Sequence, residues 1–267
     1  MGETSQNRFS ELRMWVAGAK ASAEIVGNRE RRMKMYERKE FEEKANRKGR
    51  QYIEYLRGLQ YCFEFIRRYS LLRIMDAGAG TGKATSELEN TLGRGLEFVN
   101  LGMNGPEDKS SAKLSGNYIV SDFETVKGLK RGSFGGIISV FGAFNYSPYP
   151  NMVIRKADRL LAPGGLVKFV NQLDHRDAED YQRDGFISAF ESYLEGFKKF
   201  GYSVAQSGLE EAKAHSDHIT ANGIFLAIKP SSEQHFRDFD AENLLVADRF
   251  SVAEQLQEHE LLMKNKE

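Results

Sequence analysis

The chain has 267 residues, and its 38 lysines and arginines balance 38 aspartates and glutamates. This length fits one α/β domain with extensions as well as two small domains, and it allows a sizeable core without a metal or disulfide staple. The zero net charge argues against a dedicated nucleic-acid-binding protein, although a local basic patch is compatible with it. The single cysteine, Cys62, excludes an intramolecular disulfide and favours a reducing, cytoplasmic compartment.

No membrane association is expected, because no apolar run approaches the roughly 20 residues of a membrane-spanning helix. Residues 1–9 also lack the apolar stretch of a secretory signal. Residues 1–70 are expected to form an N-terminal helical extension, since apolar residues recur every three or four positions over 9–26 and again over 52–66. Segment 29–50 contains ten basic and five acidic residues. It is a solvated helix, a surface for RNA phosphates or a partner of the acidic tail.

Residues 71–230 change rhythm and are expected to form the main domain. The expected strands are 71–75, 96–101, 117–121, 136–140, 166–171, 202–206 and 224–228, with helices over 84–92 and 152–161. Strands that alternate with helices predict βαβ units and a mainly parallel sheet in an α/β fold. The stretch between the last two strands is rich in turn residues and shows no strong helix. These two strands are therefore expected to pair antiparallel at the edge of the sheet.

The last segment, 231–267, is expected to be an acidic helical tail. It contains nine acidic and four basic residues. The run Ser-Val-Ala-Glu that starts at Ser251 fits a capping box, which predicts that a helix begins there. This tail and the N-terminal extension are candidate surfaces for an oligomer contact.

The strongest functional signal is a glycine-rich turn between an apolar strand and a helix. The run Asp-Ala-Gly-Ala-Gly-Thr-Gly extends from Asp76 to Gly82. Glycines allow a sharp turn and the close approach of a ligand, and the N–H groups at the start of the helix favour an anionic group. The spacing matches neither the dinucleotide motif, because the third glycine comes one residue early, nor a P-loop. A tight turn without a ligand is the simpler alternative.

This turn and three later motifs resemble the class I S-adenosylmethionine-dependent methyltransferases over about 70–230. The later motifs are Ser121-Asp122-Phe123 after the third strand, the block 133–145 for the fourth strand and its loop, and the block 159–170 with its Pro-Gly-Gly turn. The resemblance implies a doubly wound, Rossmann-like sheet of seven strands and S-adenosyl-L-methionine as cofactor. It places the cofactor against Asp76, Ala77, Gly78, Ala79, Gly80, Gly82, Gly102, Asn104, Asp122, Phe123 and Phe141.

Two positions depart from the pattern of this family. The acid that grips the ribose hydroxyls at the end of the second strand aligns with Gly102, and Asn104 or Asn100 is a neutral candidate to replace it. The fourth strand begins Phe134-Gly135 where the family has Phe-Asp. Because a hydrogen bond to a charged group is worth about 1.5–3 kcal/mol, the loss of the acid is expected to weaken cofactor binding about tenfold or more.

The residues after the fourth and fifth strands are the candidates for catalysis, because ligands of a doubly wound sheet bind beyond the carboxyl ends of its strands. Asn145 and Tyr146 follow the fourth strand, and His175 follows the fifth as a candidate base. Methyl transfer depends mainly on alignment, and a base is needed only where the acceptor loses a proton. His215 and His218 lack further ligands in helical register, so no metal site is expected.

The acceptor stays open between three alternatives. The first is a small molecule, which is the leading interpretation. The second is RNA or protein, with segment 29–50 as the docking surface for RNA. The third is a catalytically inactive binding or scaffold subunit, which the departures at Gly102 and Gly135 favour and the intact glycine motif disfavours. The acceptor does not follow from the fold, because one fold serves many functions.

Overall fold

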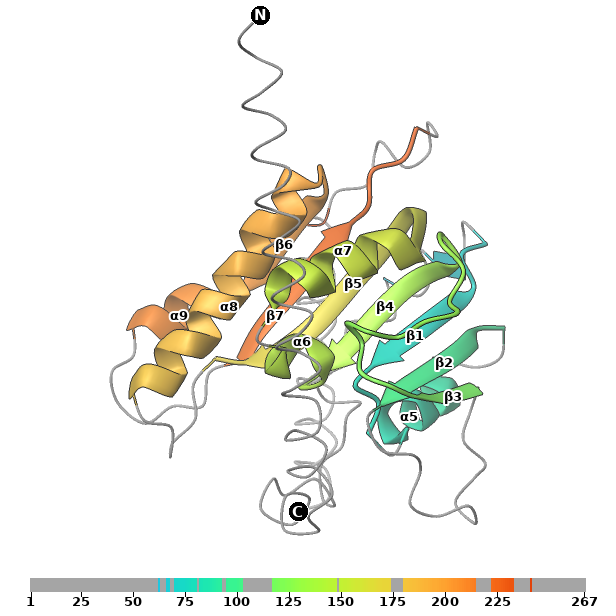
Figure 1. The fold of residues 1–267 in the computed structure, drawn as a ribbon, viewed down its shortest axis with the longest axis horizontal. Helices are drawn as coiled ribbons and strands as arrows, with labels where there is room; N and C mark the ends of the chain where they lie inside the picture. The colour runs from blue at the N-terminus through green and yellow to red at the C-terminus, as the bar shows by residue number, and fades with distance from the viewer. Residues whose placement is uncertain are drawn as a thin grey trace, which may run out of the picture. The chain divides into compact units, whose positions relative to one another are not determined.

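The computed structural model describes residues 62, 66–67, 70–80, 82–92, 95–102, 117–147, 149–173, 180–214, 222–232 and 241. All of them belong to one compact unit, Gln51–Glu267. Within it, a central sheet is covered by helices (Figure 1). Most of the predicted N-terminal extension, 1–70, and of the predicted tail, 231–267, lies outside the described residues, so both assignments stay predictions.

The sheet has seven strands, which confirms the predicted fold. They are β1 Arg73–Ala77, β2 Glu97–Gly102, β3 Asn117–Val120, β4 Phe134–Val140, β5 Leu161–Gln172, β6 Ser203–Ser207 and β7 Asn222–Ile228, in the order β3-β2-β1-β4-β5-β7-β6. The pairs among β1 to β5 are parallel, and β7 runs antiparallel to both β5 and β6. The expected antiparallel pair is therefore confirmed, with β6 at the edge.

Five helices have described bounds. They are α5 Lys83–Leu92, α6 Ala143–Tyr146, α7 Pro150–Leu160, α8 Asp180–Lys199 and α9 Leu209–Ala214. The stretch between the last two strands, where the sequence shows no strong helix, contains the short helix α9, which begins at the buried Leu209. Helix α8 was not among the predicted elements. None of the helices in these described ranges is both long and apolar enough to cross a membrane.

The two faces of the sheet form two separate hydrophobic cores. On one face, α7 and α8 cover Met75, Ile137 and Phe169 (Figure 1). On the other face, α5 and the side chains of Cys62 and Ile66 cover Ile74 and its neighbours. Successive side chains of a strand point to opposite faces, so Met75 and Ile74 enter different cores. Strands covered on both sides read as continuous apolar runs, which is why the sequence revealed them.

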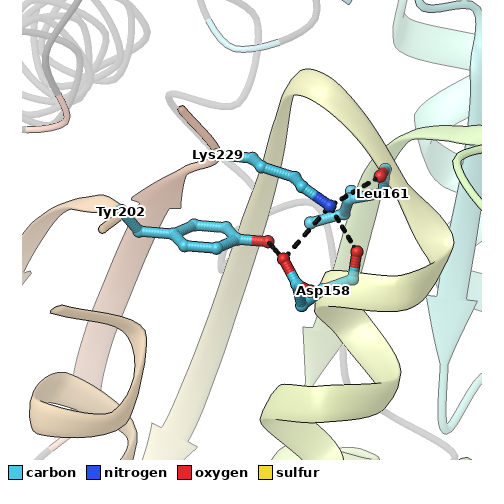
Figure 2. A network of polar contacts seen from close by, with 4 residues as sticks. All are labelled: Asp158, Leu161, Tyr202 and Lys229. Atoms are coloured by element: carbon cyan, nitrogen blue, oxygen red, sulfur yellow. Dashed lines mark hydrogen bonds and ion pairs between the residues drawn. The ribbon is translucent and has the colours of Figure 1, made fainter. Parts of the chain in front are cut away.

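A polar network joins α7, β5 and the end of β7 at the side of the sheet where β5 begins, opposite to the carboxyl ends of β1 to β5 (Figure 2). The Lys229 ammonium lies 3.1 Å from the Asp158 carboxylate and donates to the backbone oxygens of Asp158 and Leu161. Tyr202 donates to the same carboxylate at 3.0 Å. Lys229 therefore satisfies two carbonyl groups where α7 ends and β5 begins. This network stabilises the edge opposite to the carboxyl ends of β1 to β5.

Candidate cofactor and active site

The glycine motif forms the turn between β1 and α5. Gly78, Gly80 and Gly82 have positive φ angles of 93°, 56° and 79°, a region that other residues seldom occupy. A Cβ on Gly80 would have no atom within 4 Å, so this glycine borders open space. The N–H groups of Gly78 and Ala79 both donate to Leu101 O at 2.8 Å, which ties the turn to β2. The turn therefore fits the close approach of a cofactor at Gly80.

Asp76 supports this turn from within the protein, with 3% of its surface exposed. Burial raises the pKa of its carboxyl to about 7, although a hydrogen bond from Thr85 acts in the opposite direction. Thr85 Oγ1 lies 3.2 Å from Asp76 Oδ2 and also within hydrogen-bond distance of Asn100 Oδ1. The Thr85 hydroxyl therefore links Asp76 of β1 to Asn100 of β2 beneath the turn.

The segment after β4 packs directly on the glycine turn. Ser139 donates its hydroxyl proton to Ala77 O at 2.8 Å, and Ala77 itself is fully buried. Phe141 has a φ of 49° although it is not a glycine, and its N–H donates to Val170 O at 2.8 Å. A left-handed conformation costs a residue with a Cβ about 1–3 kcal/mol and is concentrated at functional sites. Phe141, a predicted cofactor residue, thus lies at the carboxyl edge in a strained conformation.

Asp122 and Phe123 lie directly after β3, in the order that the sequence predicts. Asp122 Oδ1 accepts hydrogen bonds from the backbone N–H of Thr125 at 2.8 Å and from its hydroxyl at 2.6 Å. The Phe123 ring is buried and lies 5.5 Å from the Phe144 ring. The side chain of Phe123 is therefore part of the core beneath α7 and α8.

At the end of β2, the space beside Gly102 contains a side chain that the sequence did not predict there. Gly102 is the last residue of β2, and the Tyr118 hydroxyl from β3 lies beside it. Tyr118 donates this hydroxyl proton to Gly80 O in the glycine turn. Asn104 lies outside the described residues. Asn100 contacts Thr85 and is fully buried, which places it beneath the turn.

Of the predicted catalytic residues, the structure positions one completely. Asn145 lies in α6, its side chain is buried, and its N–H donates to Gly142 O at 3.0 Å. Tyr146 is the last residue of α6, but its side chain is outside the described part, as is all of His175. Asn171 on β5 donates to Phe144 O at 3.1 Å, which holds α6 over the end of the sheet. Among the described residues, its side-chain oxygen has no hydrogen-bond partner.

Sequence reasoning missed a polar contact between the segment after β3 and the segment after α6. Ser147 donates its hydroxyl proton to the Glu124 carboxylate, and both side chains are buried. Ser147 Oγ also accepts the N–H of Tyr149 at 3.2 Å. No pattern in the sequence predicts that these two residues meet. Ser139 could have been found, because it is the one polar residue in the apolar run 136–140. In the described ranges, no group of three histidine, cysteine or acidic side chains could hold a metal ion.

Comparison with known proteins agrees with this geometry. Residues 75–169 match a family model described as a methyltransferase domain. No curated protein matches the chain significantly. Solved structures with a similar arrangement include the Haemonchus contortus phosphoethanolamine N-methyltransferase 2, in complex with phosphomonomethylethanolamine and S-adenosylhomocysteine. It has 15% identity, covers 60% of this chain and 49% of its own, and gives a TM-score of 0.46.

Two further structures illustrate the range of similar proteins. Geranyl diphosphate C-methyltransferase from Streptomyces coelicolor has 12% identity, covers 59% of this chain and 72% of its own, and gives a TM-score of 0.43. The [4+2]-cyclase SpnF has 15% identity, covers 60% of this chain and 75% of its own, and gives a TM-score of 0.47. The chain spans about half the length of the Haemonchus enzyme. The family match falls on β1 to β5, so residues 75–169 form a methyltransferase domain.

Proposed function

We propose that this chain binds S-adenosylmethionine at the carboxyl edge of the sheet and transfers its methyl group to a small-molecule acceptor. The observation that supports this most directly is Gly80, which has a positive φ and borders open space within the matched domain. Bound there, the cofactor supplies an electrophilic methyl group on a sulfonium. The chain itself then has to bind, orient and exclude water.

The proposed roles on the cofactor side follow the three segments at this edge. Gly78 and Gly80 admit the methionine part, and Asp122 accepts from the adenine amino group while the Phe123 N–H binds a ring nitrogen. Ala77, Ala79, Gly82 and Phe141 shape the turn and its neighbour. Asp76 holds the turn through Thr85 and Asn100. Gly102 and Asn104 stay the proposed positions at the ribose.

On the acceptor side, we propose that Asn145 and Tyr146 orient the acceptor and that His175 takes a proton where the acceptor must lose one. Asn145 supports this because α6 places it, buried, directly after β4. The Asn171 carbonyl oxygen is a second polar group at the end of β5. A buried asparagine on a short helix fits an enclosed acceptor, as is usual for small-molecule sites.

The departure at Gly135, which favoured an inactive subunit, has a packing explanation. A Cβ on Gly135 would lie 1.9 Å from Leu71 O, so an aspartate does not fit at this start of β4. This start lies at the opposite edge from the glycine turn. The departure therefore does not count against activity.

The decisive experiment is calorimetric titration of the full chain with S-adenosylhomocysteine. Binding supports the enzyme, and no binding would leave the scaffold alternative. Radiolabelled S-adenosylmethionine is then offered with a filtrate of small metabolites, with total RNA and with denatured cell protein. Label in the metabolite fraction supports the proposal, and label in RNA or protein would replace it with the alternative in which segment 29–50 is a docking surface.

The remaining expectations are proposals of the same kind. We place the protein in the cytoplasm because its one cysteine is buried and unsuited to a disulfide. The extension 1–70 and the tail 231–267 are the proposed sites of any oligomer contact. Sedimentation analysis of the full chain, with and without S-adenosylhomocysteine, tests this.

A further inference from the structure

Tyr118 fills the space beside Gly102 at the end of β2. A Cβ built on Gly102 would lie 2.2 Å from the Tyr118 hydroxyl oxygen and 3.5 Å from the backbone nitrogen of Gly80. The same hydroxyl donates its proton to Gly80 O. One phenol therefore touches the two positions, in β2 and in the glycine turn, between which the resemblance places the cofactor ribose.

The register of the sheet explains why a residue of β3 reaches this place. Asp76, Asn100 and Tyr118 are direct partners across β1, β2 and β3. Ile119 packs against the core beneath α7 and α8, so its neighbour Tyr118 points to the other face, where α5 and the glycine turn lie. Gly102 has no side chain, and this leaves room for the phenol to extend over the end of β2.

We propose that Tyr118 supplies the ribose-binding group of the cofactor site in place of the acid that Gly102 lacks. This inference rests on the proposed function and adds a residue that positions the cofactor. The chemistry matches, because the family's acid accepts hydrogen bonds from ribose hydroxyls. The Tyr118 hydroxyl gives its one proton to Gly80 O, so its lone pairs are what it offers to a ribose.

The phenol stays a neutral acceptor at physiological pH. Burial, reinforced by the nearby carboxylate of Asp76, raises the pKa of Tyr118 above its ordinary value. A neutral acceptor binds a hydroxyl more weakly than a carboxylate does. Asn100 is less suited to the role, since it contacts Thr85 beneath the turn. The site is therefore expected to bind the ribose, with a smaller contribution than an acid would make.

The first test removes the phenol hydroxyl from the protein and, separately, the ribose hydroxyls from the ligand. Tyr118→Phe is titrated with S-adenosylhomocysteine and with its analogue that lacks both ribose hydroxyls. We expect Tyr118→Phe to weaken the first about fivefold, the value of one neutral hydrogen bond, and to leave the second unchanged. Tyr202→Phe is the matched control, because it removes a phenol hydroxyl at the opposite edge. Equal weakening of both ligands would show that the hydroxyl only holds the turn, and would overturn the proposal.

The second test restores the acid. Gly102→Asp alone is expected to weaken binding, because its Cβ would collide with the phenol. Gly102→Asp combined with Tyr118→Ala removes the obstacle and is expected to bind S-adenosylhomocysteine at least as tightly as the parent. A double variant that binds no better than Tyr118→Ala, while unfolding at the same temperature, would overturn the proposal. Failure of the parent itself to bind would overturn the proposed function as well, so the two failures are distinguishable.

Discussion

Gly78 and Gly142 are in backbone contact, which locks the turn after β1 to the segment after β4. A Cβ on Gly78 would lie 2.5 Å from the Gly142 Cα, and a Cβ on Gly142 would lie 2.4 Å from Ala77 O. Both neighbours are backbone atoms, which cannot move aside as a flexible side chain can. The glycines of this region thus have different duties. Gly78 and Gly142 permit packing, whereas Gly80 faces open space.

This difference predicts opposite outcomes for two substitutions. Gly80→Ala is expected to leave most of the stability, losing about 1–2 kcal/mol for the left-handed backbone, and to reduce S-adenosylhomocysteine binding strongly. Gly78→Ala is expected to destabilise the fold more, since its Cβ meets fixed backbone. Gly128→Ala is the control, because Gly128 also has a positive φ and open space but lies between β3 and β4. Urea unfolding and calorimetry measure the two effects. Unchanged binding by Gly80→Ala would contradict the cofactor assignment.

Asp122 is expected to have two roles that one substitution can separate. Asp122→Asn keeps an oxygen for the two hydrogen bonds from Thr125, so the turn and the stability should be preserved. Its amide then turns a donor toward the adenine amino group. The affinity for S-adenosylhomocysteine should fall by about 1.5–3 kcal/mol, the value of a hydrogen bond to a charged group. An affinity equal to that of the parent in calorimetry would place the adenine elsewhere.

The stability of the fold should fall with rising pH because of Asp76. The folded carboxyl has a pKa of about 7 against 3.8 for the ordinary group, so the folded state holds its proton where the unfolded chain has lost it. The stabilisation is complete below about pH 4 and is lost as the pH rises to 7, by roughly 4 kcal/mol in total. Asp76→Asn should lack this dependence. Urea unfolding of both proteins at about pH 5 and pH 8 tests it, and parallel changes would refute it.

The network at the far edge should matter for stability and not for the cofactor. Lys229→Met leaves the Asp158 carboxylate and two carbonyl groups without their ammonium donor, which should cost about 1–3 kcal/mol. Lys199→Met is the matched control, because its ion pair with Glu195 is exposed and should be worth less than about 1 kcal/mol. The measurement is urea unfolding with parallel calorimetry. A changed S-adenosylhomocysteine affinity in Lys229→Met would contradict the separation of the two edges.

The buried strands and the glycine turn could be predicted because they depend on local pattern. Strand β4 is buried throughout, and the glycines of the motif from Asp76 to Gly82 favour the positive φ angles of the turn. Strand β5 begins at Leu161. The sequence predicted a start at 166, because Pro163 and the two following glycines resemble a turn. Helix α8 was missed although Phe186, Phe190, Tyr193 and Phe197 share one helical face. That signal was present in the sequence.

The contacts of the site could not be predicted in the same way. Tyr118 reaches Gly80 only because β2 and β3 pair with Asn100 opposite Tyr118, and no local pattern specifies that register. The same holds for Ser147 and Glu124, which meet across two loops. The raised pKa of Asp76 depends on burial by residues that are distant in sequence, such as Thr85 and Asn100. Tertiary contact decides each of these features.

The position of β7 also affects how the chain folds while it is being synthesised. It inserts between β5 and β6, so that Leu166 pairs with Ile228. Until the ribosome has made residues 222–228, the twelve-residue strand β5 has an unpaired edge, and such an edge invites pairing with other chains. The cofactor loops, all of which precede β5, can meanwhile be complete. A nascent chain halted before β7 is therefore expected to aggregate more readily than the complete chain, because the edge of β5 is still open to pairing.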